Sequence, residues 1–287
     1  MKRRVILNKG KWSEGDCKRG SGWSKRSVGL ERVRWEQDAE TLARLSNVSV
    51  DEVDRLRERD SDGVAEVTHE LYRRYWSGDR SPEAEVKLYS DPLYLIESWV
   101  CYFEWAKIAG DRFKKIAAQG ELFSIPPGST AVDLGAGCGL STIDLLSVPG
   151  IERVIYQNHP KATTQIDYFQ SVIPDELADS IELSLDGDIP KGDVYFASEF
   201  YEHIRRPGDH LESVLAHEPF AFVHATSFSA PWAPGHFHEY HYGDKSVPGN
   251  RGAKRLFHNI LRARGYERRH CTTFWNGRPA VWIKPSS

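Results

Sequence analysis

The stretch 131-AVDLGAGCGL-140 puts a lone acid, Asp133, after a short apolar run and then three glycines within five positions. The apolar run predicts a strand and the residues beyond the glycines predict a helix. Gly135 permits a sharp turn between them, and Gly137 lets backbone approach a ligand with no side chain in the way. Gly139 stands at the helix start, where free N–H groups attract polar ligand atoms. The stretch therefore predicts a nucleotide-binding turn.

Strand and helix patterns alternate through the rest of the chain, which predicts a mostly parallel sheet with helices on both faces. The predicted strands are 130–134, 153–157, 181–185, 193–198 and 220–226, and the predicted helices are 139–147, 161–171, 208–216 and 251–264. Two final strands, 266–275 and 278–284, are expected to form an antiparallel hairpin through Asn276 and Gly277.

The chain ahead of this region has a different composition. Residues 1–34 contain eleven Lys or Arg and three Asp or Glu, so we expect a basic, loosely ordered arm of net charge +8 on a body of −11. Residues 35–120 have helical patterns, including a capping box at Ser49–Glu52, and predict a helical cap. Residues 92–110 are apolar nearly all round and are expected to be buried. Residues 121–287 are expected to form the nucleotide-binding domain.

Composition favours a cytoplasmic protein. No apolar run approaches the roughly 20 residues that a membrane helix needs, so we expect no membrane partner. The four cysteines show neither CxxC pairing nor zinc spacing, which is typical of a reduced compartment. The oligomeric state does not follow from these patterns.

Two common nucleotide classes fit the glycine stretch poorly. The dinucleotide fingerprint needs its third glycine at position 140, where this chain has Leu140, and an acid about 20 residues further on, where 155–158 read Ile-Tyr-Gln-Asn. A phosphate-binding P-loop needs Gly-Lys-Ser/Thr, which the stretch lacks.

Three motifs in register resemble the class I S-adenosylmethionine-dependent methyltransferases. They are 132-VDLGAGCG-139, 186-DGDIPKGDVYFASEFYEHI-204 and 261-LRARGYERRH-270, and the resemblance covers 130–284. It implies an α/β, Rossmann-like three-layer sandwich: a mostly parallel seven-stranded sheet with a C-terminal antiparallel hairpin, plus the helical N-terminal extension. It also implies S-adenosyl-L-methionine as the cofactor.

The resemblance assigns the cofactor residues. Asp133 and the backbone of Gly135, Ala136, Gly137 and Gly139 would hold the amino-acid end, Asp186 or Asp188 the adenine amino group, and Ser198 and Glu199 would border the methyl-transfer site. The family usually ends its second strand in an acid that binds the ribose hydroxyls. Here that position is Gln157, which lacks the charge.

Catalysis is expected from His203, as the general base that takes a proton from the acceptor or as a residue that orients the loop. Glu199 and Glu202 would assist it. The loop 235-GHFHEYHYGD-244 is expected to form an acceptor lid, with substrate-binding residues Trp232, His236, His238, Tyr240 and His241. His236 and His238 have the alternate spacing of a metal pair, but no third ligand is evident, so we predict no metal.

The acceptor is predicted by elimination. The Asn/Asp-Pro-Pro-aromatic motif of enzymes that methylate base amino groups is absent, as is a Pro-Cys nucleophile, which favours an oxygen or nitrogen of a small-molecule metabolite. Two alternatives stay open: a nucleic-acid acceptor held by residues 1–34, and a non-catalytic module that binds S-adenosylmethionine without transferring methyl.

Overall fold

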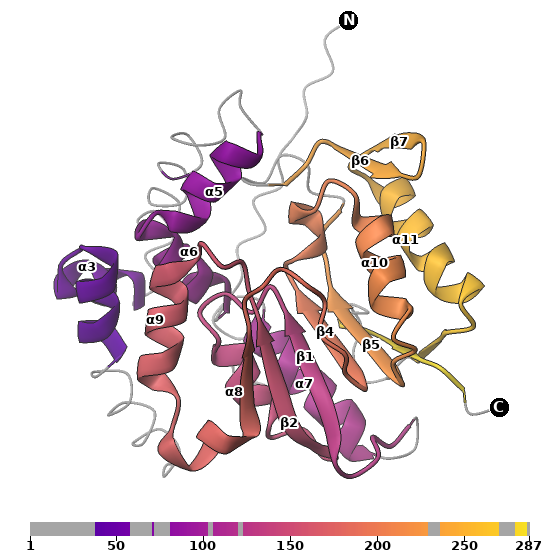
Figure 1. The fold of residues 1–287 in the computed structure, drawn as a ribbon, viewed down its shortest axis with the longest axis horizontal. Helices are drawn as coiled ribbons and strands as arrows, with labels where there is room; N and C mark the ends of the chain where they lie inside the picture. Colours follow the sequence, from indigo (N-terminus) through magenta and orange to yellow (C-terminus); the bar gives the residue numbers. More distant parts are fainter. Residues whose placement is uncertain are drawn as a thin grey trace, which may run out of the picture.

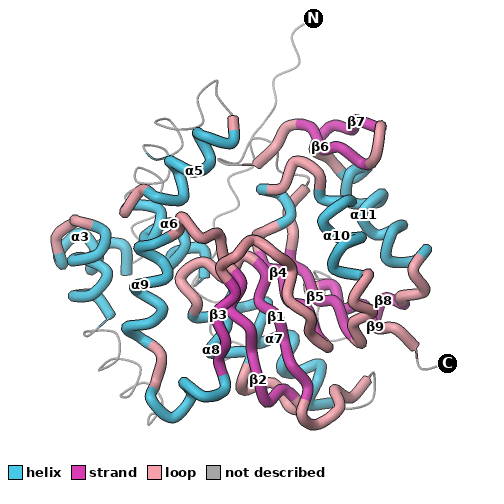
Figure 2. The backbone as a smooth tube through the Cα atoms, viewed as in Figure 1, coloured by secondary structure: helices cyan, strands magenta, loops and turns pink. Residues whose placement is uncertain are grey.

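The computed structural model describes residues 38–57, 71, 81–102, 106–119, 123–228, 236–269 and 279–285. A seven-stranded sheet of order β3-β2-β1-β4-β5-β9-β8 forms the centre (Figures 1 and 2). Its strands are β1 (Ser129–Leu134), β2 (Ile151–Gln157), β3 (Ile181–Ser184), β4 (Val194–Ser198), β5 (Ala221–Ala225), β8 (Glu267–Arg269) and β9 (Ala280–Ile283). The first five are parallel, and β9 is antiparallel to both β5 and β8. The predicted fold class is confirmed; Asn276 and Gly277 lie outside the described residues.

Helices cover both faces of the sheet, as Figure 1 shows. One face packs on α7 (Lys107–Gln119) and α8 (Leu140–Leu145), and the other on α10 (Pro207–Leu215) and α11 (Arg251–Ala263). Alternation along β4 explains both contacts: Phe196 joins the core that contains Phe113 of α7, and Tyr195 joins the core that contains Phe257 of α11. The central strand is therefore buried on both sides.

The N-terminal extension contains α3 (Val50–Arg57), α5 (Pro82–Ser90) and α6 (Leu93–Cys101). The capping box of α3 is confirmed, since Ser49 Oγ accepts from Glu52 N at 3.2 Å and Ser49 N donates to Glu52 Oε2 at 3.3 Å. Helices α5 and α6 both contact α9 (Thr163–Val172), which lies beside them in Figure 1. The extension is thereby attached to the domain that follows it, while the arm 1–34 lies outside the described residues.

The predicted lid differs from expectation, because part of it is regular structure. Strands β6 (Glu239–Tyr242) and β7 (Lys245–Pro248) pair antiparallel in a separate two-stranded sheet. Gly243, at φ +59°, and Asp244 make the two-residue turn between them. The described part of the chain also contains two short 3₁₀ helices, η2 (Asp175–Ser180) and η3 (Tyr201–His203). Among the described helices, none has the length and apolar character to cross a bilayer.

Candidate functional site

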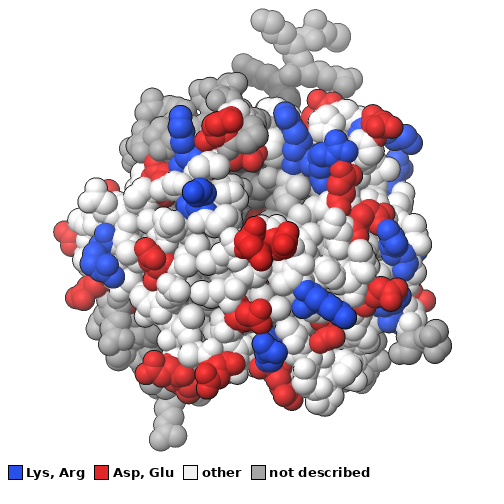
Figure 3. Space-filling view, viewed as in Figure 1, with Lys and Arg blue, Asp and Glu red and all other residues white. Residues whose placement is uncertain are grey.

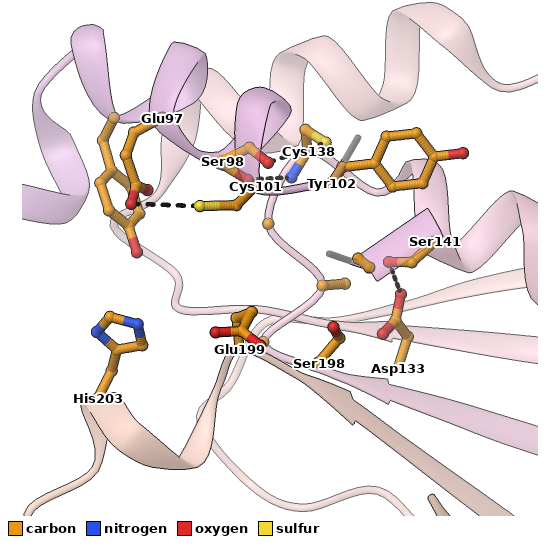
Figure 4. A pocket seen from close by; sticks show the side chains of 15 residues that line it. Glu97, Ser98, Cys101, Tyr102, Asp133, Cys138, Ser141, Ser198, Glu199 and His203 are labelled. Carbon is orange, nitrogen blue, oxygen red and sulfur yellow. Dashed lines mark hydrogen bonds between the residues drawn. The ribbon is translucent and has the colours of Figure 1, made fainter. Parts of the chain in front are cut away.

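A pocket lies at the carboxyl ends of the neighbouring strands β1 and β4. The helices that follow these two strands lie on opposite faces of the sheet. Helix α8 follows β1 onto one face, and α10 follows β4 onto the other, so a crevice opens between neighbouring strands. The described lining residues are Tyr94, Glu97, Ser98, Cys101, Tyr102, Ala106, Asp133, Gly135, Ala136, Gly137, Cys138, Ser141, Ser198, Glu199 and His203 (Figure 4). Sequence reasoning placed seven of these residues in the site: Asp133, Gly135, Ala136, Gly137, Ser198, Glu199 and His203.

The three glycines of the turn are all in the left-handed region, with φ of +62°, +56° and +79°. A Cβ added at any of them would lie within 2.2 Å of a side-chain atom from another element. The side chains concerned are Phe200 for Gly135, Ser98 for Gly137 and Phe169 for Gly139. Close packing and backbone conformation therefore both require glycine. At Gly137 the close approach is to Ser98, which differs from the open ligand space that the sequence suggested.

Gln157 supports the turn from the end of β2. Its Oε1 accepts from Gly135 N at 3.1 Å, and its backbone oxygen accepts from Ala136 N at 2.9 Å. The side chain is 9% exposed and is absent from the described pocket lining. The amide oxygen thus holds the turn in place. The resemblance to the methyltransferases, which have a ribose-binding acid at this position, did not suggest this role.

Asp133 is buried at the bottom of the pocket. Its Oδ2 accepts hydrogen bonds from Ser141 Oγ at 2.6 Å and from Thr142 Oγ1 at 2.8 Å. Burial raises the pKa of this carboxyl to about 6, and the two hydroxyls oppose that rise. The carboxylate is therefore oriented and mostly ionised at neutral pH.

Helix α6, within the segment 35–120 that we expected to cover the site, supplies a wall of the pocket whose individual residues the sequence did not single out. Its contributing residues are Tyr94, Glu97, Ser98, Cys101 and Tyr102. They follow the spacing i, i+3, i+4, i+7, i+8 and so share one face of the helix, while Leu95, Ile96, Trp99 and Val100 are buried in the core. The expectation that residues 92–110 would be buried is wrong for most of this face, where only Tyr102 is buried and the other four residues are half-buried. The polar pair Glu97–Ser98 within an apolar helix was the available signal.

The wall opposite α6 is formed by the end of β4 and by η3. In Figure 4, Glu199 and His203 lie across the pocket from Glu97 and Cys101. Glu199 has φ +47°, an unusual conformation for a residue with a side chain, and its N–H donates to Ala225 O. Ser198 Oγ is buried and has no hydrogen-bond partner within the described part of the chain. Strained backbone and an unsatisfied hydroxyl are both common where a ligand binds.

Glu202 lies behind this wall and is 0% exposed. Its Oε1 accepts from Ser227 N at 2.8 Å, and its backbone oxygen accepts from Phe237 N at 3.2 Å. His236 is also buried, and its ring meets the ring of His203 edge-on with centroids 5.0 Å apart. One donor atom each from Glu199, Glu202 and His236 lie within 4.8 Å of one another. The fold thus assembles a group that the sequence did not connect.

The remaining candidate residues lie outside the described pocket lining. Asp186 and Asp188 are exposed beyond β3, where Asp186 Oδ1 accepts from Asp188 N at 3.1 Å. In and around the β6–β7 hairpin, His238 is exposed, His241 is half-buried and Tyr240 is buried. Trp232 is not among the described residues.

Comparison with known proteins yields similarity in structure only. No family model matches the chain, and no curated protein matches it. It is similar to human N-acetylserotonin methyltransferase in complex with SAM: 11% identity and a TM-score of 0.49 over 84% of this chain and 72% of that one.

Two further solved structures are similar at comparable levels. A putative methyltransferase from Haloferax volcanii, in complex with the Trm112 activator, shares 16% identity with a TM-score of 0.41 over 63% of this chain and 94% of that one. The cyclase SpnF shares 13% identity with a TM-score of 0.39 over 56% and 58%.

Proposed function

We propose that this chain is an S-adenosylmethionine-dependent methyltransferase that acts on an oxygen or nitrogen of a small metabolite. The observation that carries the proposal is the charge of the pocket. Three carboxylates line it, those of Glu97, Asp133 and Glu199, and the described lining contains neither Lys nor Arg. Such a site favours a ligand with a sulfonium and an ammonium group over the phosphates of a dinucleotide or triphosphate.

The residues of β1 and its turn suit the amino-acid end of this cofactor. Asp133 offers an oriented carboxylate to an ammonium group. The turn's N–H groups at Gly135, Ala136, Cys138 and Gly139 already donate within the protein, whereas that of Gly137 has no acceptor among the described residues. We assign the Gly137 N–H to the cofactor's carboxylate, and Asp186 or Asp188 to its adenine amino group.

The β4 end would supply the chemistry. S-adenosylmethionine, when bound, presents a methyl group on a sulfonium, and transfer requires the acceptor atom in line with it. Alignment of this kind is worth roughly 7–11 kcal/mol. Ser198, Glu199 and His203 line the pocket wall where the acceptor would lie. We assign acceptor positioning to Ser198 and Glu199 and proton acceptance to His203, a step that contributes about 10²–10⁴-fold.

Titration calorimetry of the full chain tests the cofactor assignment. We expect S-adenosylmethionine and S-adenosylhomocysteine to bind with micromolar dissociation constants, whereas NAD⁺ and ATP give no heat. Equal or tighter binding of the phosphate ligands would contradict the proposal, as would the absence of both heat and thermal shift with S-adenosylmethionine. Once an acceptor is found, His203→Ala should leave the cofactor's dissociation constant unchanged and lower kcat at least about 100-fold.

A nucleic-acid acceptor is the alternative within the same enzyme class, and it depends on the +8 charge of residues 1–34. On the face in Figure 3, described Lys and Arg side chains are interspersed with Asp and Glu. Among the described residues, that face therefore has no continuous basic surface that could bind a nucleic acid together with residues 1–34. Binding of RNA or DNA that weakens steeply with salt and disappears on deletion of 1–34 would favour this alternative over a metabolite.

A non-catalytic module that holds S-adenosylmethionine is the second candidate function. It is favoured by Gln157, because the amide oxygen that would bind the ribose instead accepts from Gly135 N. This candidate predicts cofactor binding by calorimetry with no methyl transfer to any acceptor. Detection of S-adenosylhomocysteine on incubation with a metabolite library would exclude it.

A further inference from the structure

We propose that Glu199, Glu202 and His236 bind a divalent transition-metal ion behind the pocket wall. The donor atoms come from two segments that are 34 residues apart in sequence, yet they lie within 4.8 Å of one another. Metal–ligand bonds of about 2.1 Å require donors roughly 3 to 4 Å apart, so small side-chain rotations would bring these three donors to that spacing and leave the remaining coordination positions open.

The buried carboxylate of Glu202 is the second observation that points to a cation. Glu202 is 0% exposed, and its Oε2 has no hydrogen-bond partner within the described part of the chain, although Oε1 accepts from Ser227 N. A buried carboxylate oxygen without a donor costs free energy, and a bound cation removes that cost. One carboxylate oxygen of Glu202 lies within 4.8 Å of a donor atom of Glu199 and of His236, so the charge of this buried carboxyl group is close to both other ligands.

Backbone contacts fix the two segments relative to each other. Phe237 N and Tyr240 Oη both donate to Glu202 O, at 3.2 and 3.1 Å, and His241 N donates to Arg205 O at 2.9 Å. His236, the residue before Phe237, is therefore held beside η3 before any metal binds. A preformed site of this kind loses little entropy when the metal arrives.

The donor types select the metal. Two carboxylates and one imidazole suit Mn²⁺, Fe²⁺, Co²⁺ or Zn²⁺ better than Ca²⁺ or Mg²⁺, because the latter two prefer oxygen ligands only. Two carboxylate charges balance the charge of a dication. The alternate spacing of His236 and His238 does not form this site, since His236 is buried and His238 is exposed.

Glu199 is both a proposed metal ligand and a pocket-lining residue. The ion would therefore lie next to the part of the pocket where the methyl acceptor would bind. The metal proposal does not depend on the cofactor assignment, because none of the three ligands comes from the glycine turn. The two can therefore fail separately.

The test is titration of the metal-free full chain with Mn²⁺, in which the electron paramagnetic resonance signal measures the Mn²⁺ that remains free. A parallel titration with Zn²⁺ is measured by calorimetry. We expect one ion per chain, with binding weakened at least about 10-fold in Glu202→Gln and in His236→Asn. His238→Asn is the matched control, an exposed histidine two residues further on, and should bind as wild type does.

Two outcomes overturn the proposal. One is a wild-type chain that takes up no Mn²⁺ or Zn²⁺, and the other is a Glu202→Gln/His236→Asn double variant that keeps wild-type affinity. If the buried variants do not fold, as circular dichroism would show, Glu199→Gln replaces them, because this side chain is only half-buried. Its affinity must then fall at least about 10-fold, and unchanged affinity overturns the site.

Discussion

Ser98 of α6 accepts a hydrogen bond from the backbone N–H of Cys138 at 2.7 Å, across 40 residues of sequence. Its hydroxyl occupies the space that a side chain at position 137 would need. One serine therefore joins the N-terminal extension to the glycine turn and closes the pocket on that side. The extension is part of the site's architecture.

A double-mutant cycle at Ser98 and Gly137 measures this contact. Gly137→Ala should destabilise the fold through its left-handed φ and the clash with Ser98 Oγ, and Ser98→Ala should cost about 1 kcal/mol by leaving Cys138 N without its acceptor. In the double variant the clash is absent, since Ser98 Cβ would lie 3.5 Å from the new Cβ. We expect its loss of unfolding free energy in urea to be about 0.5–3 kcal/mol less than the sum.

Gly128→Ala is the matched control for this cycle. Gly128 has φ +83° and no atom within 4 Å of an added Cβ, so it reports the conformational cost alone, about 1–2 kcal/mol. Additive losses at Ser98 and Gly137, or a Gly137→Ala cost equal to that of Gly128→Ala, would show that the contact contributes no steric energy.

The raised pKa of Asp133 predicts a pH-dependent affinity for a cationic ligand. Below pH 6 the carboxyl is protonated and its attraction for an ammonium group is lost, so the S-adenosylmethionine dissociation constant should rise about tenfold between pH 7.5 and pH 5. Asp133→Asn should bind weakly at both values, because it carries no charge. Calorimetry at the two pH values checks this, and a flat profile for the wild type would remove Asp133 from the cofactor's ammonium.

The same group predicts an opposite effect on stability. The pKa of Asp133 is higher when folded than the unfolded value of 3.8, so its contribution is present below that value and is lost as pH rises through about 6. Asp133→Asn, whose amide oxygen can still accept from Ser141 and Thr142, should therefore raise unfolding free energy at pH 7.5 by up to about 3 kcal/mol. Urea titration at pH 4.5 should show a smaller gain.

Gln157 can be tested for its structural and ligand roles separately. Gln157→Leu removes the acceptor of Gly135 N, so we expect the unfolding free energy to fall by about 1–3 kcal/mol. Gln157→Glu keeps an acceptor and adds the charge that resembling enzymes place there, so stability should be nearly retained and S-adenosylmethionine affinity should rise about threefold or more. Unchanged affinity in Gln157→Glu would mean that the ribose lies elsewhere.

A buried histidine pair predicts acid sensitivity. His258 Nε2 lies 3.2 Å from His224 Nε2, and burial, with Lys254, Arg268 and Arg262 nearby, lowers the pKa of His258 to about 3. The unfolded chain takes up this proton below pH 6.5 and the folded chain does not, so stability falls as pH drops from 6.5 toward 3. Titration of this one group lowers the free energy of unfolding by at most about 1.4 kcal/mol for each pH unit.

His258→Gln, which can still donate to His224 but does not titrate, should lose less stability between pH 7 and pH 5 than the wild type. His238→Gln, at an exposed position, should follow the wild type. Urea unfolding at three pH values measures the stability of the three proteins. If the free energy of unfolding falls with pH equally in the wild type and in His258→Gln, His258 is not the cause of the acid sensitivity.

The order of elements and their bounds followed largely from local sequence. The apolar run 194–198 is a strand and the amphipathic segment 251–263 is a helix, each within a few residues of its predicted position. The spacing of apolar residues along a single segment is sufficient to predict its secondary structure. Asp133 and the turn glycines were also recognisable, since a strand, an acid and three glycines are adjacent in the chain. By contrast, the β6–β7 hairpin was missed, because its strands are short and lie among polar and aromatic residues.

Contacts between distant segments were decided by the tertiary structure alone. No local pattern places Ser98 against Gly137, Phe169 against Gly139, or His236 beside Glu202, because each pair depends on how α6, α9 and β6 pack on the sheet. Local periodicity specifies which face of an element is apolar, but the side chain that fills a given space is selected by packing of the whole domain. The sequence by itself thus determined the fold and half of the pocket, and packing determined the wall that faces it.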